Sequence, residues 1–136
     1  MIQFYLLSVL FNAAAGFVLL SGDSGEESSL EAGLRVPFRN ETFRLILGLL
    51  TMVAGLFKLL SPVQGATPVL GDLIPALAGL GAGFVVLLGY YGSRPVLDGE
   101  RSSKIMETVS RNRKWLGFAA LGSALLHFLF PQALLL

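Results

Sequence analysis

Two cationic side chains interrupt otherwise apolar stretches of the chain at matching places. Lys58 precedes Leu59-Leu60-Ser61-Pro62, and His127 precedes Phe128-Leu129-Phe130-Pro131. An ionisable side chain inside an apolar stretch is costly, so it needs either a partner or a function. The two together predict a binding site for an anion, a carboxylate or a lipid head group. The alternative is that Lys58 extends its amine to a bilayer surface and that His127 only hydrogen-bonds locally.

Asp72 and Asn12 complete this candidate ligand-binding set. Asp72 stands just before an apolar stretch that has Pro75 in its first turn, so it also suits a helix N-cap. Asn12 lies deep in the first apolar stretch, where an amide either bonds a neighbouring helix or lines a ligand path. Pairing Asp72 with His127 would be the one catalytic arrangement, in a lipid-modifying or intramembrane enzyme, but nothing in the sequence requires them to meet.

Most other chemistry is absent from the sequence. The chain has no Cys and one His, so neither a thiolate nucleophile nor a metal or haem site within one chain is expected. It also lacks the glycine-rich phosphate loops and the G-x-S-x-G serine motif. We expect no catalytic residue, no metal and no cofactor.

Four apolar segments must position these residues. They cover 2–20, 43–60, 73–91 and 115–130, and each would span roughly 24–28 Å as a helix. The chain is 54% apolar and 14% charged, with a mean hydropathy of +0.71, which is too apolar for a water-soluble domain of this size. The sequence predicts an all-α integral membrane protein with four transmembrane helices. A cleaved signal peptide at 1–20 is disfavoured because no Lys or Arg precedes the apolar run.

The distribution of charge predicts the orientation of the helices. Of ten Lys and Arg, only Lys58 lies outside the two longer connections and their flanks. Because Lys and Arg collect on the cytoplasmic side, the loops 21–42 and 92–114 should be cytoplasmic and both termini should lie outside a plasma or inner membrane.

An internal repeat accompanies this alternation. Residues 15–18 and 82–85 both read AGFV, 67 positions apart, and sliding 42–62 onto 111–131 aligns Arg44 with Arg113, Gly48 with Gly117 and Lys58 with His127. We therefore predict two tandem hairpins in the same orientation, 1–62 and 63–136, related by an axis along the membrane normal. Shared membrane-helix composition is the alternative.

Small residues indicate where helices touch. Helices in lipid gain from contact where glycine and alanine allow close backbone approach. The sequence alone leaves open whether these contacts lie within one subunit or between subunits, and the thin bundle favours a homodimer. The predicted helix-packing glycines are Gly16, Gly48, Gly79, Gly83 and Gly117.

The segment 97–114 predicts a separate amphipathic helix on the inner leaflet. Ile105, Met106 and Val109 would face the lipid, and the cations would contact anionic head groups. Aromatic residues do not interleave with these cations, so nucleic acid is not an expected partner, whereas docking of a protein partner stays open. The predicted inner-leaflet contacts are Arg101, Lys104, Arg111, Arg113 and Lys114.

Two functions fit these features. The first is a transport or channel-type ligand-binding module, which the repeat, the glycine-rich helices and the Lys58/His127 pair favour. The second is a structural or accessory subunit that packs against a larger membrane assembly, which the scarcity of ionisable groups within the spans favours.

Overall fold

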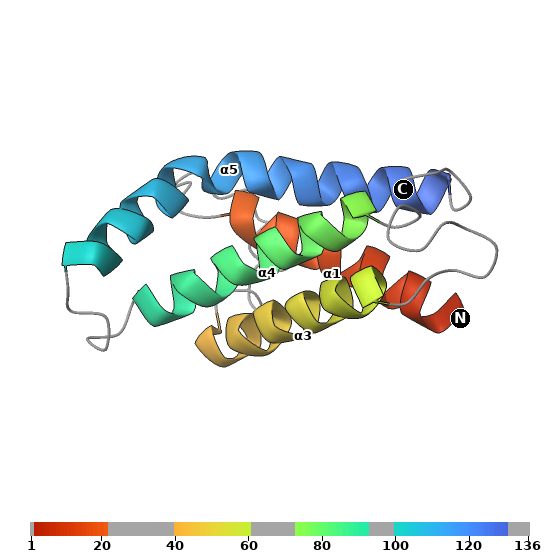
Figure 1. Cartoon of the computed structure of the whole chain (residues 1–136), viewed down its shortest axis with the longest axis horizontal. Helices are drawn as coiled ribbons and strands as arrows, with labels where there is room; N and C mark the ends of the chain where they lie inside the picture. The colour runs from red at the N-terminus through yellow and green to blue at the C-terminus, as the bar shows by residue number, and fades with distance from the viewer. Residues whose placement is uncertain (1, 22–39, 61–72, 93–99, 131–136) are drawn as a thin grey trace, which may run out of the picture.

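The computed structural model describes residues 2–21, 40–60, 73–92 and 100–130. These residues form four helices, which are α1 (Ile2–Leu20), α3 (Glu41–Leu60), α4 (Leu73–Gly92) and α5 (Glu100–Leu129). Every secondary-structure element within the described ranges is helical, so the predicted all-α four-helix fold is confirmed. The helices run alternately up and down, and α1 begins at the end of the bundle where α5 ends (Figure 1).

The start of α3 is fixed by its capping residue. The Asn40 side-chain oxygen accepts hydrogen bonds from the backbone N–H of Thr42 at 2.9 Å and of Phe43 at 3.4 Å. These bonds satisfy donors that have no partner within the helix. Glu41 follows in the first turn, where a negative charge interacts well with the helix dipole. The helix therefore begins two residues before the apolar stretch itself.

The predicted break between an amphipathic segment and the fourth apolar helix is wrong. A single 30-residue helix, α5, covers both. The sequence changes from polar to apolar near Trp115, but it has neither Gly nor Pro between Glu100 and Leu116. A change of polarity does not interrupt backbone hydrogen bonding, whereas Gly and Pro do. The first turns of α5 extend past the end of α4 (Figure 1).

The four helices pack in two close pairs. α1 lies along α5, and α3 lies along α4, and these are the two most extensive contacts between elements. α1 and α4 also contact each other, with α5 and α3 on opposite sides of them (Figure 1).

Equivalent glycines form the two close pairs. A Cβ placed on Gly16 of α1 would lie 2.9 Å from the Gly117 carbonyl oxygen of α5, and one on Gly83 of α4 would lie 2.8 Å from the Gly48 carbonyl oxygen of α3. Gly16 and Gly83 both belong to the AGFV phrases, and Gly48 aligns with Gly117. Any side chain at these positions would force the backbones apart. The repeated sequence thus makes the same contact in both pairs.

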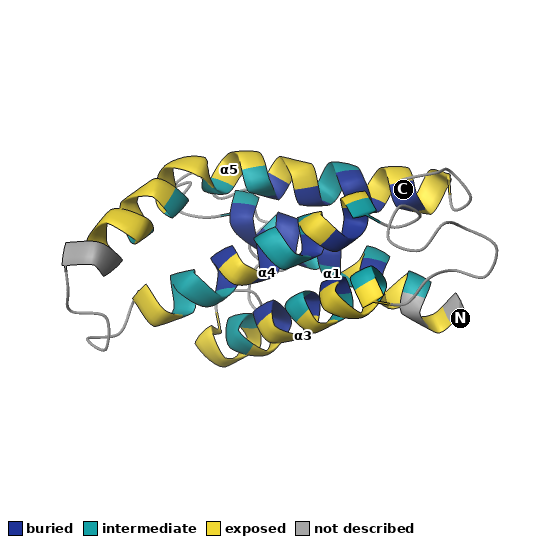
Figure 2. Cartoon of the chain, in the orientation of Figure 1, coloured by how far each residue is buried: buried dark blue, intermediate teal, exposed yellow. Residues whose placement is uncertain are grey.

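Small residues make up much of the interior of the bundle, together with a few larger ones such as Leu19 and His127. A cluster of buried apolar side chains lies along the second half of α1 and α4, and large apolar side chains occupy the outer faces of the helices. Figure 2 shows the buried positions gathered along the centre and exposed positions along α3 and α5. The apolar cluster consists of Ala15, Val18, Leu19, Leu47, Ala82, Val85, Val86 and Ala120.

Candidate functional site

Lys58 and His127 meet at the end of the bundle where α3 and α5 both end. Lys58 Nζ lies 2.6 Å from His127 Nε2, which is hydrogen-bond distance. His127 is only 1% exposed, whereas Lys58 is half-buried. The two helices lie on opposite sides of the α1–α4 pair, so the contact depends on the length of both side chains.

Tyr5 of α1 covers this pair. Its ring centroid lies 4.7 Å from that of His127, and Lys58 Nζ lies 5.5 Å from the Tyr5 ring centroid. Such a distance permits a cation–π interaction. The Tyr5 hydroxyl donates a hydrogen bond to the His127 backbone oxygen at 2.7 Å. That carbonyl belongs to the last turn of α5, where helix carbonyls lack intrahelical donors. Tyr5 therefore caps α5 while it covers His127. We call Tyr5, Lys58 and His127 the triad.

The short contact between the two nitrogen atoms requires one proton between them. If the Lys58 ammonium donates, His127 Nε2 must carry no proton; if Nε2–H donates, the Lys58 amine must be neutral. The pair bears one positive charge in the first arrangement; in the second it bears one only if Nδ1 also carries a proton, and none otherwise. A second proton would place two positive charges in direct contact, which is strongly unfavourable away from bulk water.

Buried polar side chains continue inward from the triad. Ser123 lies one helical turn before His127 on α5, is 4% exposed, and its hydroxyl has no hydrogen-bond partner among the described residues. Ser8 and Asn12 are each 2% exposed on α1, and Thr51 of α3 is fully buried. Tyr5, Ser8 and Asn12 are spaced for one face of α1 and extend about 10 Å along it.

Asn12 binds the neighbouring helix directly. Its Nδ2 donates to the Pro75 backbone oxygen of α4 at 2.9 Å. Its Oδ1 lies 2.7 Å from the position that a Cβ on Gly79 would take. Thr51 instead donates from its hydroxyl to the Leu47 backbone oxygen of its own helix at 2.6 Å. Of the two interpretations of Asn12, this geometry supports a bond between helices.

Apolar side chains close the other half of the interior. The buried apolar cluster begins beyond Asn12 and Thr51 and includes Leu19, Leu47 and Val86. At the triad end of these polar residues, Lys58 and Tyr5 are only half-buried.

The other predicted site residues are Asp72, the five packing glycines and the basic residues of α5. Asp72 lies outside the described residues. The five predicted packing glycines each lie against another helix of this same chain. Gly122 of α5, by contrast, has no neighbouring atom within 4 Å of the position that a Cβ would take, so it faces away from the other helices.

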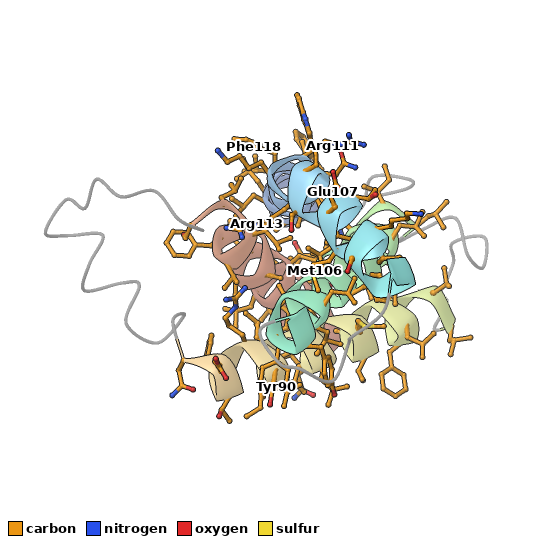
Figure 3. All side chains as sticks on the ribbon, turned by 90° about the vertical axis from the view of Figure 1, so that its left-hand side faces the viewer. Tyr90, Met106, Glu107, Arg111, Arg113 and Phe118 are labelled. Atoms are coloured by element: carbon orange, nitrogen blue, oxygen red, sulfur yellow. The ribbon has the colours of Figure 1, made fainter. Side chains whose placement is uncertain are left out.

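The basic residues in the first half of α5 differ in their contacts and exposure. Arg113 Nε donates to the Leu19 backbone oxygen at 3.0 Å, so Arg113 caps the last turn of α1. Lys104, Arg111 and Lys114 are exposed, and the side chain of Arg101 lies outside the described residues. Figure 3 shows Arg111 and Phe118 pointing away from the bundle and Arg113 lying on the side of α1.

Two residues of the candidate site, Ser8 and Tyr5, were given no role by the sequence analysis. The signal was the spacing of Tyr5, Ser8 and Asn12, which repeats at three and four residues in an otherwise apolar helix. Within the described residues no group of three His, Asp or Glu side chains could hold a metal ion.

Comparison with known proteins places the chain in a family. A protein of Treponema pallidum (strain Nichols), described as uncharacterized, is 41% identical over 137 aligned positions that cover 100% of both chains. No solved structure matches the chain with statistical significance. A family model of unknown function matches residues 1–127. The chain therefore belongs to this family.

Proposed function

We propose that the protein is an integral membrane protein that binds a small polar ligand at the triad, as a transport or channel-type module. The observation that carries this proposal is a set of polar side chains buried beside the apolar cluster, in a bundle whose exterior is apolar. Its interior holds Ser8, Asn12, Thr51, Ser123 and His127, while large apolar side chains lie on its exterior.

The exterior supports insertion into a bilayer. α3 and α4 are long and apolar enough to cross a membrane, and α1 carries a shorter apolar stretch, Tyr5–Leu20. The core helix of a water-soluble protein passes the same criterion, but it is mostly buried. In the apolar windows of α3 and α4 only 22% and 39% of the residues are buried. Lipid would cover the remaining apolar surface, including Leu50, Phe57 and Phe84.

Charge supports the orientation. Arg44, Lys104, Arg113 and Lys114 all lie at the end of the bundle opposite the triad, which favours a cytoplasmic location for that end. The triad then opens to the outside. Trp115 is 76% exposed near the cytoplasmic end, where an indole ring suits the membrane interface.

For transport, a ligand would have to pass the half of the interior that is filled by apolar side chains. A ligand bound near Ser123 can return to the outside past Lys58 and Tyr5. To reach the cytoplasm it must separate Leu19, Leu47 and Val86. The glycine contacts hold α1 to α5 and α3 to α4 backbone against backbone. We therefore assign the transport step to a movement of one pair relative to the other, and we propose a homodimer as the working unit.

Substituted cysteines test the binding site, since the chain has no native Cys. The probe is the anionic thiol reagent (2-sulfonatoethyl) methanethiosulfonate, added outside intact cells or sealed vesicles. Ser123→Cys should react, because ligand and reagent share the route past Lys58. Ala120→Cys is the matched control: it lies three residues deeper, in the apolar cluster, and should not react. Lys58→Gln should slow the labelling of Ser123→Cys, since it removes a cation from the route. Equal failure of both cysteines to react would overturn the proposed site.

A second function is favoured by the projecting part of α5. Its first turns extend beyond the bundle and expose Lys104, Ile105 and Arg111, a surface that a larger membrane assembly could bind. Gentle purification separates the two functions. An accessory subunit should co-purify with another membrane protein in fixed ratio, whereas a self-sufficient module should elute alone as a homodimer.

A further inference from the structure

We propose that the triad binds a small carboxylate together with one proton, so that ligand binding adds no net charge to the bundle. This inference rests on the proposed binding site and names the chemical class of its ligand. It follows from the contact between Lys58 and His127, from the surroundings of that contact, and from the position of Ser123.

The Lys58/His127 pair lacks one of the two protons that it could bind. With Lys58 as the ammonium donor and His127 neutral, the two nitrogen atoms, 2.6 Å apart, hold one positive charge where two are chemically available. Two like charges at this distance repel strongly in a site that is shielded from bulk water, and the repulsion grows as they approach. An anion placed between the two nitrogen atoms would cancel this repulsion. The second proton can then bind, and both side chains become cationic donors.

Within the described ranges, the titratable groups that the contacts place around the pair come from three helices. Tyr5 faces it from α1, Lys58 belongs to α3 and His127 to α5. The described part of α4 contributes no Asp, Glu, Lys or Arg, and its two tyrosines, Tyr90 and Tyr91, lie in its last turn at the opposite end. Asp72 precedes α4 in the sequence and lies outside the described residues, so the experiment includes a variant of it.

The donors at the site match the shape of a carboxylate. A carboxylate has two oxygen atoms, each of which accepts more than one hydrogen bond. The ammonium of Lys58 and the imidazolium N–H of His127 supply two charge-assisted donors. We assign a third donor to the Ser123 hydroxyl, which lies one helical turn before His127 on α5, is 4% exposed and has no hydrogen-bond partner among the described residues. The covering Tyr5 ring favours a ligand with a short apolar tail.

Uptake of a proton lowers the energetic cost of binding the anion. Transfer of a lone anion into an apolar interior is very costly. When a proton enters with it, the site changes from one positive charge to two positive charges and one negative charge, so the net charge stays the same. Binding should therefore become tighter as the pH falls, by about tenfold per pH unit, for as long as one proton is taken up per ligand.

The experiment uses the full chain in phosphatidylcholine nanodiscs with acetate as the probe. His127 is the only histidine, so the ¹⁵N signals of its ring can be assigned without mutagenesis. Titration with acetate at constant pH should convert these signals to those of imidazolium. Calorimetry in two buffers of different ionisation enthalpy should give an uptake of one proton per acetate. Lys58→Gln should weaken acetate binding at least tenfold, and Asp72→Asn should leave the proton uptake unchanged.

Two further measurements distinguish a small carboxylate from inorganic phosphate and from an anionic lipid head group. Inorganic phosphate at equal concentration should bind more weakly than acetate, and nanodiscs that contain phosphatidylglycerol should not produce the imidazolium signal without acetate. Production of that signal by the anionic lipid alone would overturn the small-carboxylate assignment. Acetate binding without proton uptake, or loss of uptake in Asp72→Asn, would overturn the proton coupling. No acetate binding, with Ser123→Cys still labelled, would refute this inference and leave the proposed site intact. If acetate does not bind and Ser123→Cys is not labelled, the proposed site is refuted as well.

Discussion

At the scale of single residues, Asn12 and Thr51 show that equal burial does not mean an equal role. Both lie deep in the bundle, but Asn12 donates to the Pro75 carbonyl of another helix, whereas Thr51 donates to the Leu47 carbonyl of its own helix. A bond within a helix survives separation of the helices, so it contributes little to their association. A bond between helices is lost when they separate.

Replacement of these two residues should therefore have different effects on stability. Asn12→Ala should lower the free energy of unfolding by about 1 kcal/mol, a value typical of polar contacts between membrane helices with some loss of packing. Thr51→Val removes a hydroxyl without changing side-chain shape. It should lower the free energy of unfolding by less than half as much as Asn12→Ala. Equilibrium unfolding in mixed detergent micelles measures both changes. A larger loss for Thr51→Val than for Asn12→Ala would contradict this assignment.

The sequence indicated the residues of the candidate site more readily than their contacts. Lys58 and His127 were identified because charge is rare in apolar stretches, and their alignment in the repeat predicted equal depth. It did not predict a hydrogen bond between them, because this depends on how α1 and α4 separate α3 from α5. The capping of α5 by Tyr5 joins residues 122 positions apart, and no local pattern reports such a contact.

At the scale of helices, the two close pairs depend on glycine at equivalent positions. Gly16→Ala and Gly83→Ala should each lower the free energy of unfolding by about 2 kcal/mol or more, because the new methyl group would meet a backbone carbonyl of the partner helix. Gly122→Ala is the matched control in α5, since it meets nothing within 4 Å. It should be neutral or stabilise by up to about 1 kcal/mol through helix propensity. The same unfolding assay measures all three, and equal effects would contradict the role of the glycines.

The ends of a helix could be predicted where the change between apolar and polar sequence coincides with a residue that caps or breaks a helix. α1 begins and ends at the predicted residues, and α4 extends one residue beyond them. α3 begins earlier because Asn40 caps it. α5 was divided wrongly because polarity changes near Trp115 while the backbone meets no helix-breaking residue. Met106 then packs against Gly92 at the end of α4, a contact that only a continuous α5 provides.

At the scale of the whole molecule, the proposed orientation rests on the distribution of Lys and Arg. Reporter fusions at Gly25 and Gly99 should both give cytoplasmic signals, and a fusion after Leu136 should give an external signal. Substitution of Lys104, Arg111 and Lys114 by Gln should weaken this preference, because each cation near a membrane surface contributes about 1 kcal/mol. An external signal at either glycine in the native sequence would contradict the orientation.

The central claim is that the outside of this bundle faces lipid while part of its inside is polar. Ser123 and Leu125 test it most directly, because they lie two residues apart on α5, with Ser123 buried and Leu125 59% exposed. Nitroxide spin labels at the two positions, in reconstituted vesicles, report collisions with oxygen, which concentrates in lipid, and with a water-soluble nickel chelate. We predict that the label at Leu125 collides frequently with oxygen and rarely with the nickel chelate. Frequent collision of the Leu125 label with the nickel chelate, as on a water-soluble protein, would contradict the account.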